Sequence, residues 1–177
     1  MRKNYILWPY KLPYQNSCGE QSSTKEYLRS FRSLNNSVEM QYVYYGDYLK
    51  LSGCLSSDDY LYVVGHGGIG HPYISNAPDG GENVSAPELC IRLRALGLLM
   101  CSSCKIKVFT CYSGLGEPGF AMSLADELRS RGYSAVSVYG YGGAVTPYIN
   151  EHKRCFPLAF QKNFSLVCRA SQLRSSM

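Results

Sequence analysis

Apolar runs of strand length alternate along this chain with segments whose hydrophobic residues recur at helical spacing. The strand-like runs are rich in aromatic and β-branched residues and cover 5–10, 40–45, 60–64, 105–110 and 134–139. The segments 22–34, 85–96 and 119–131 instead place apolar residues three or four positions apart, as in Tyr27, Leu28, Phe31 and Leu34. The pattern therefore predicts alternating strands and helices from residue 5 to residue 139.

The helix predicted at 85–96 has the clearest start signal. Ser85 is a good N-cap residue, Pro87 follows in the first turn, and Glu88 stands three residues after the serine. Residues 69–85 are rich in Gly, Pro, Asn, Ser and Asp, and we expect a long surface loop there. Farther on, 156–160 and 164–167 are expected to add one or two short strands.

The fold class follows from this alternation. The run 60–64 is almost continuously apolar, which is typical of a strand buried on both faces of a parallel sheet. We expect an α/β fold with three layers, in which helices cover both faces of a mostly parallel central sheet. The length of 177 residues fits one domain, so residues 1–177 are expected to form it, with the basic segment 146–177 as part of it.

Composition and charge narrow the class of protein. With 45% hydrophobic and 18% charged residues, the chain is not intrinsically disordered, and no apolar run approaches the roughly 20 residues that a membrane span needs. The net charge of +5 is uneven: residues 1–88 carry −2 and residues 89–177 carry +7. This basic half is either a solvated face or a site for an acidic partner or a polyphosphate ligand. Without a nucleic-acid-binding motif, we expect no nucleic-acid partner.

The eight cysteines are too few for a disulfide scaffold. The apolar stretch 5–8 is stopped by Pro9 and is too short for a signal peptide, so we expect a cytoplasmic protein, or one delivered into a host cell by a signal-independent route. In a reducing compartment the cysteines would be thiols rather than bridges. Cys101 and Cys104 have the spacing of a redox pair or half a zinc site, but they precede a strand and no second pair follows. No metal or cofactor is expected.

Reactive residues follow two of the predicted strands. His66 comes directly after the run 60–64 and its glycine, and Cys111 comes directly after the run 105–110. Ligands of open α/β sheets bind outside the carboxyl ends of the strands, so neighbouring strands would place this imidazole beside this thiol. A thiolate is a nucleophile that an adjacent imidazole can generate. The N–H groups of Gly67 and Cys111 would then suit an oxyanion hole.

The stretches Tyr60-Leu-Tyr-Val-Val-Gly-His66-Gly67 and Ile106-Lys-Val-Phe-Thr-Cys111-Tyr-Ser-Gly114 resemble the caspase-like cysteine peptidases, which include legumains, clostripains and toxin autoprocessing domains. The resemblance covers about residues 5–145. It implies a caspase-hemoglobinase-like fold and an endopeptidase that cleaves a protein or peptide substrate through an acyl-enzyme thioester. By the same resemblance, its role would be that of a bacterial effector or an autoprocessing protease.

By this resemblance His66 and Cys111 form the catalytic dyad, and Gly67 with Cys111 forms the oxyanion hole. The substrate cleft would use the segment after the next strand, with these residues in contact with substrate: Tyr139, Gly140, Tyr141, Gly142 and Gly143. The pentapeptide of true caspases is absent around Cys111, which excludes a true caspase. No residue identifies the side chain preferred before the cut.

Two alternatives stay open. The tetrapeptide Leu51-Ser52-Gly53-Cys54 resembles the Leu-Ser-Gly-Cys motif of the cytotoxic necrotizing factor-like glutamine deamidases, in which Cys54 would act with His66, twelve residues on. That family's β-rich fold suits the alternating helices poorly. The non-enzymatic alternative is an α/β binding module whose basic half holds an acidic partner.

Thiol labelling distinguishes the three hypotheses. The peptidase hypothesis predicts that iodoacetamide reacts fastest at Cys111, because a catalytic thiol is accessible and has a base nearby. Fastest reaction at Cys54 would favour the deamidase, and the absence of any hyper-reactive thiol would favour the binding module. Peptide mapping by mass spectrometry after a short exposure gives the order of reaction.

Overall fold

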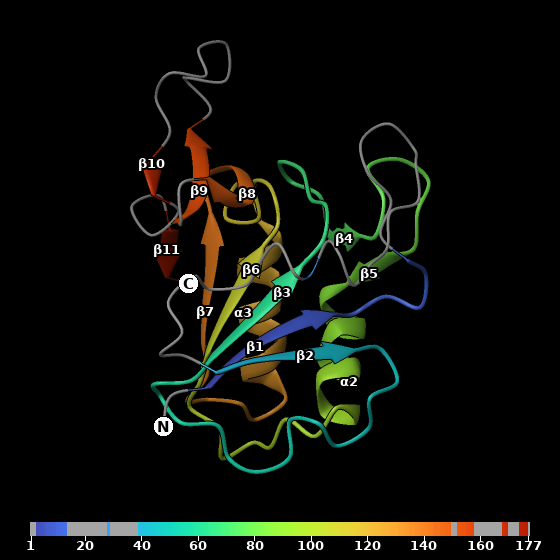
Figure 1. Cartoon of the computed structure of the whole chain (residues 1–177), viewed down its shortest axis with the longest axis vertical. Coiled ribbons are helices and arrows are strands. Elements are labelled where there is room, and N and C mark those ends of the chain that lie inside the picture. Colours follow the sequence, from blue (N-terminus) through green and yellow to red (C-terminus); the bar gives the residue numbers. More distant parts are fainter. Residues whose placement is uncertain are drawn as a thin grey trace.

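A computed structural model describes residues 3–13, 28, 39–149, 152–157, 168–169 and 174–176 of the chain. Its centre is a six-stranded sheet in the order β11-β7-β6-β3-β1-β2 (Figure 1). The strands β2, β1, β3, β6 and β7 run parallel, and β11 joins antiparallel at the edge of β7. Their bounds are Lys3–Trp8 for β1, Glu39–Tyr44 for β2, Tyr60–Val64 for β3, Lys105–Phe109 for β6, Ser137–Tyr141 for β7 and Arg174–Ser176 for β11.

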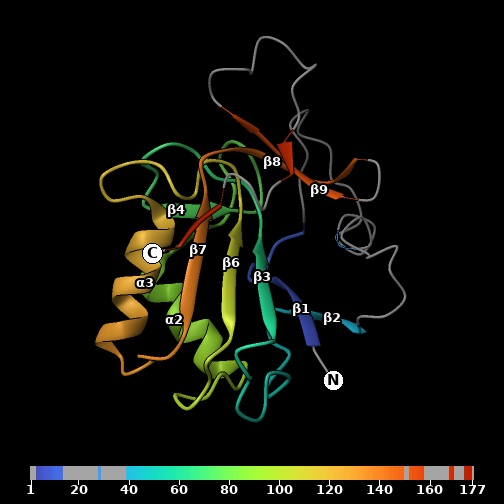
Figure 2. The same cartoon turned by 90° about the vertical axis from the view of Figure 1, so that its left-hand side faces the viewer.

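Two helices follow the strands of this sheet. Helix α2 spans Ala86–Ala95 and α3 spans Phe120–Ser130, and they pack against each other on one side of β3, β6 and β7 (Figure 2). The predicted α/β fold with a mostly parallel central sheet is thereby confirmed. The helix predicted at 22–34 lies outside the described residues except for Leu28, which is helical and fully buried in the core.

The predicted start of α2 is confirmed in detail. The Ser85 side chain accepts a hydrogen bond from the Glu88 N–H, and the Glu88 carboxylate accepts one from the Ser85 N–H at 3.0 Å. These two bonds form a capping box that satisfies backbone donors at the helix start. None of the helices in the described part of the chain has the length and apolar character needed to cross a membrane.

Three boundaries differ from the predictions. The segment 69–85 is not one loop, because Tyr73–Ser75 (β4) and Asn83–Ser85 (β5) pair as an antiparallel hairpin. The last parallel strand begins at Ser137 rather than at residue 134. Ser137 pairs with Lys105, the first residue of β6. A second sheet, in the order β10-β9-β8, contains Gly143–Ile149 (β8), His152–Pro157 (β9) and Cys168–Arg169 (β10). Of the strands expected at 156–160 and 164–167, β9 covers only the start of the first, and the rest lies outside the described residues.

One cation is buried between β3 and β6. The Lys107 side chain is 7% exposed, its Nζ donates to the Tyr62 hydroxyl at 3.0 Å, and it lies 3.8 Å from the centroid of the Tyr60 ring. A buried ammonium group is costly unless it is paired, and here a hydroxyl and two aromatic rings surround it. These contacts explain why lysine is tolerated inside a central strand.

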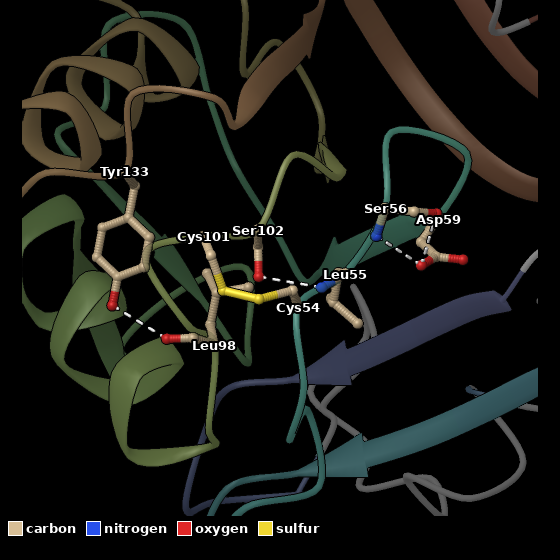
Figure 3. Close-up of a disulfide and its surroundings, with 8 residues drawn as sticks. All are labelled: Cys54, Leu55, Ser56, Asp59, Leu98, Cys101, Ser102 and Tyr133. Carbon is tan, nitrogen blue, oxygen red and sulfur yellow. Dashed lines mark hydrogen bonds between the residues drawn. A yellow bond between two sulfur atoms is a disulfide. The ribbon is translucent and has the colours of Figure 1, made fainter.

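The prediction that the cysteines are thiols is wrong for two of them. Cys54, in the loop before β3, is bonded to Cys101, between α2 and β6, with their Cα atoms 5.6 Å apart (Figure 3). Beside the bridge, the Leu55 N–H donates to Ser102 Oγ at 3.1 Å. Cys104 is a fully buried thiol, so it forms no redox pair with Cys101. The bridge ties together the two loops that lead into β3 and β6.

The bridge is expected to stabilise the fold. It closes a loop with a sequence separation of 47 residues, for which the chain-entropy model gives about 4 kcal/mol and experiments commonly find about 2–4 kcal/mol. Replacing both residues (Cys54→Ser with Cys101→Ser) should lower the free energy of unfolding by that amount in urea titrations. A reductant should lower the stability of the natural chain to the same level and leave the double variant unchanged. Equal stability of the two proteins would contradict this role.

Candidate active site

The pairing of β3 with β6 brings the two predicted catalytic residues to one edge of the sheet. The strands run parallel in register from Tyr60 opposite Lys105 to Val64 opposite Phe109, so the chain leaves both strands at the same level. A Cβ atom placed on Gly67 would lie 2.8 Å from the Cys111 carbonyl oxygen and 2.8 Å from Thr110 Oγ1. The backbone after His66 therefore touches the backbone at Cys111.

A second contact joins the same two loops farther out. The Gly70 N–H donates to the Leu115 carbonyl at 3.1 Å, and a Cβ atom on Gly116 would lie 2.5 Å from the Gly70 Cα. Glycine is required at Gly116 for another reason as well, since its φ of 113° lies in a region that other residues rarely adopt. The loops that follow His66 and Cys111 thus form one continuous surface.

The β4–β5 hairpin holds His66 in place. The His66 N–H donates to the Ser75 carbonyl at 2.8 Å, and the Ser75 N–H donates to the His66 carbonyl at 3.0 Å. This two-bond bridge extends the hairpin to the end of β3. The His66 side chain is half-buried and lines a cavity between the loop after β3 and the hairpin.

The turn that carries Cys111 is strained and firmly tied down. Tyr112 has a φ of 57°, a left-handed conformation that is rare for a bulky residue. The buried Ser113 hydroxyl donates to the Val108 carbonyl at 2.7 Å and accepts from the Tyr141 N–H at 3.2 Å. These two hydrogen bonds tie the turn to β6 and β7 and offset the backbone strain of Tyr112, next to Cys111 at the sheet edge.

Glycine at position 140 permits this turn to pack on β7. A Cβ atom on Gly140 would lie 2.6 Å from the Gly114 Cα and 2.8 Å from the Ala121 Cβ, so any side chain there would push the Cys111 turn away. The sequence pattern predicts that Gly140 follows the strand at 134–139. The structure instead places it inside β7, where its lack of a side chain is a packing requirement.

The Cys111 sulfur receives a backbone hydrogen bond from β8. The Val145 N–H donates to Cys111 Sγ at 3.4 Å, and this thiol is free and half-buried. Burial raises the pKa of the Cys111 thiol above its ordinary value, although the Val145 N–H opposes the shift. For comparison, burial raises the pKa of Cys90 and of Cys104 to about 12. Cys111 is therefore a protonated thiol at neutral pH and requires a base to become a nucleophile.

Two backbone N–H groups at this edge make no backbone hydrogen bond in the described part of the chain. The Gly67 N–H and the Cys111 N–H donate to no other residue there, and the Cys111 N–H hydrogen-bonds its own thiol, which opposes the effect of burial on the pKa of that thiol. Backbone N–H groups without a protein acceptor at a sheet edge are available to an incoming carbonyl oxygen. The oxyanion hole expected from the sequence at Gly67 and Cys111 stays a prediction.

The residues predicted to contact substrate fall in two places. Tyr139, Gly140 and Tyr141 belong to β7 and pair with β11, and the Tyr141 side chain is buried. Gly142 links β7 to β8, and Gly143 opens β8, where its carbonyl accepts the Tyr112 N–H at 2.9 Å. The segment beside the cysteine is thus 142–145, whereas the first three residues lie within the sheet.

The structure does not bring Cys54 near His66. Cys54 precedes β3 and His66 follows it, and the five residues of this strand alone span roughly 15 Å at about 3.3 Å per residue. The Cys54 sulfur is also bonded to Cys101. The pairing required by the deamidase hypothesis is therefore absent from this structure.

Two residues of the site were missed in the sequence. His71 and Asp79 line the same cavity as His66, and the His71 ring lies 5.3 Å from that of Tyr73. The polar sequence of residues 69–85 did not predict that these two residues belong to the site. No local pattern there indicates that the β4–β5 hairpin folds back over the end of β3. Within the described residues, no group of His, Cys, Asp and Glu side chains is arranged to hold a metal ion.

Alkylation of Cys111 should depend on pH in a defined direction. Because its pKa is raised, the thiol stays protonated to higher pH, and its labelling rate should increase through a midpoint above about 8.5, the value of an ordinary thiol. Val145→Pro removes the N–H donor and should move the midpoint higher still, whereas Val145→Ala keeps the donor and should not move it. Rates at each pH come from mass spectrometry of the peptide that contains Cys111. A midpoint below 8.5, or one that Val145→Pro leaves unchanged, would contradict this account of the sulfur.

Comparison with protein-family models, with curated protein sequences and with solved structures finds no match for this chain. The resemblance to caspase-like peptidases thus rests on the two short motifs around His66 and Cys111.

Proposed function

We propose that this protein is a caspase-like cysteine endopeptidase in which Cys111 and His66 act as a catalytic dyad. The observation that carries the proposal is the contact of Gly67 with the Cys111 carbonyl and the Thr110 side chain at the carboxyl edge of β3 and β6. It supports the proposal because a nucleophile and its base must come from loops that meet, and here they follow adjacent parallel strands.

The first half of the reaction forms a thioester. His66 removes the proton from the Cys111 thiol, and the sulfur attacks the carbonyl carbon of the scissile peptide bond. The raised pKa of Cys111 fits a thiol that loses its proton to His66 when substrate is bound rather than one stored as a thiolate. The C–N bond then breaks, and the protonated His66 delivers its proton to the leaving amine.

Stabilisation of the intermediate falls to the backbone. The carbonyl oxygen becomes negatively charged after attack, and the Gly67 and Cys111 N–H groups, which donate to no other residue in the described part of the chain, would bind it. In the second half of the reaction His66 takes a proton from water as the oxygen attacks the thioester carbon. The C–S bond then breaks, the new carboxyl group leaves, and His66 returns its proton to the Cys111 sulfur. No metal or organic cofactor takes part in this scheme.

The proposal includes a protein or peptide substrate and a role as an effector or autoprocessing protease. The basic half of the chain would suit an acidic partner or a polyphosphate ligand, as its charge of +7 over residues 89–177 indicates. The Cys54–Cys101 bridge favours action in an oxidising compartment, because such bonds are reduced in an ordinary cytoplasm. Delivery by a signal-independent route agrees better with this bridge than a permanently cytoplasmic location.

Cleavage assays on a peptide library test the dyad. Cys111→Ala should abolish cleavage, and His66→Ala should lower kcat/KM by about 10²–10⁴-fold, because each removes one partner of the proton transfer. The matched control is Cys54→Ser combined with Cys101→Ser, which removes two other cysteines and should keep activity at a temperature where the variant remains folded.

Three outcomes would contradict the proposal. Cleavage that persists in both Cys111→Ala and His66→Ala would rule out the dyad. Activity lost only on replacement of Cys54 would move the chemistry to the rival cysteine. If no member of the library is cut and Cys111 has no enhanced reactivity, the chain is a binding module.

A further inference from the structure

We infer that the cavity beside His66 is a subsite for the residue directly after the scissile bond, and that it selects a lysine or arginine side chain. The inference rests on the proposed function and deepens it by naming a substrate class. The cavity has a volume of about 250 Å³ and is lined by residues of the loop after β3 and of the β4–β5 hairpin, among them His66, His71, Tyr73, Ser75, Asp79 and Asn83.

The position of the cavity assigns it to the leaving part of the substrate. Among the described residues, its lining includes His66 and Gly67 but not Cys111. The acyl part of the substrate becomes bonded to the Cys111 sulfur, which faces Val145, whereas the amine departs from beside His66, which protonates it. A side chain that enters a cavity bounded by the histidine therefore belongs to the residue whose amine leaves.

The size of the cavity suits one side chain. Pockets for drug-sized ligands begin near roughly 300 Å³, and this one is slightly smaller. It therefore has room for one long side chain but not for several residues of a peptide.

The charge of the lining favours a cation. Asp79 carries a carboxylate, and none of the described lining residues is a lysine or an arginine. Arg92 of α2 is paired with Glu82 at 2.9 Å. The Tyr73 ring adds an aromatic surface of the kind on which ammonium and guanidinium groups bind. An acidic side chain would instead be repelled by Asp79.

The loop that carries Asp79 is held by buried polar contacts. The Asn76 side chain is 4% exposed, its amide Nδ2 donates to the Pro13 carbonyl at 2.6 Å, and its Oδ1 accepts the Glu82 N–H at 2.6 Å. The Glu82 carboxylate in turn accepts the N–H of Lys11 at 2.7 Å. A carboxylate on a loop fixed at both ends is positioned before substrate arrives, which lowers the entropy lost on binding.

Binding of leaving-group mimics tests the subsite without any need for cleavage. The full chain with Cys111→Ala is titrated with Lys-Ala-amide, Glu-Ala-amide and norleucine-Ala-amide and followed by amide NMR shifts of residues 66–83. Because Asp79 is exposed, we expect the lysine compound to bind about 3- to 10-fold more tightly than its uncharged norleucine analogue, a ratio typical of one charge pair in water. Asp79→Asn should remove this preference. The control Asp58→Asn changes an exposed acid at the opposite end of β3 and should keep it.

Cleavage of peptides that vary only after the scissile bond separates this inference from the proposed function. A preference for lysine and arginine that Asp79→Asn abolishes would support both. Cleavage with no preference at that position, or equal binding of the three amides, would overturn the subsite and leave the peptidase intact. Binding of the lysine amide by a chain that cuts no peptide would overturn both the peptidase and the assignment of the cavity to the leaving group.

Discussion

The parallel pairing of β3 with β6 is the constraint on which the rest of the structure depends. Leu61 and Val63 of β3 and Ile106 and Val108 of β6 are completely buried, and each contributes about 2 kcal/mol through the hydrophobic effect. A shift of one residue in the register would turn these side chains to the other face of the sheet. The burial therefore fixes the level at which both strands end, and the two loops with His66 and Cys111 meet because of it.

The two ends of these strands serve different purposes. At the amino-terminal end, the Cys54–Cys101 bridge and the Asp59 carboxylate, which accepts the Lys3 N–H at 2.8 Å and the Ser56 N–H at 2.8 Å, hold the incoming loops together (Figure 3). Burial would raise the pKa of Asp59, but these hydrogen bonds and the charge of Lys3 lower it overall. At the carboxyl end, Tyr112 has a strained left-handed backbone, and the Gly67 and Cys111 N–H groups donate to no other residue in the described part of the chain. The contacts at the amino-terminal end stabilise the two strands and offset the backbone strain of Tyr112 at their carboxyl end.

Close backbone contacts give the site its shape. A side chain would separate neighbouring segments of the backbone at three places: Gly67 against Cys111, Gly70 against Gly116, and Gly114 against Gly140. They explain why glycines gather after the strands. Gly140 does not form a flexible turn, since it lies within β7 itself. The cavity lined by His66 and Gly67 lies at this same edge of the sheet.

Much of the fold could be predicted because its causes are local. Apolar runs of strand length, the Ser85–Glu88 capping box and the residues that follow β3 and β6 are all visible in the amino-acid order. The Cys54–Cys101 bridge, the hairpin that holds His66, and the place of Asp79 in the cavity depend on contacts between segments far apart in the chain, which no local pattern encodes. The sequence by itself determined an α/β chain with a histidine and a cysteine at strand ends. Only the tertiary structure decided that these strands are neighbours, because the choice of partner depends on which buried faces pack together.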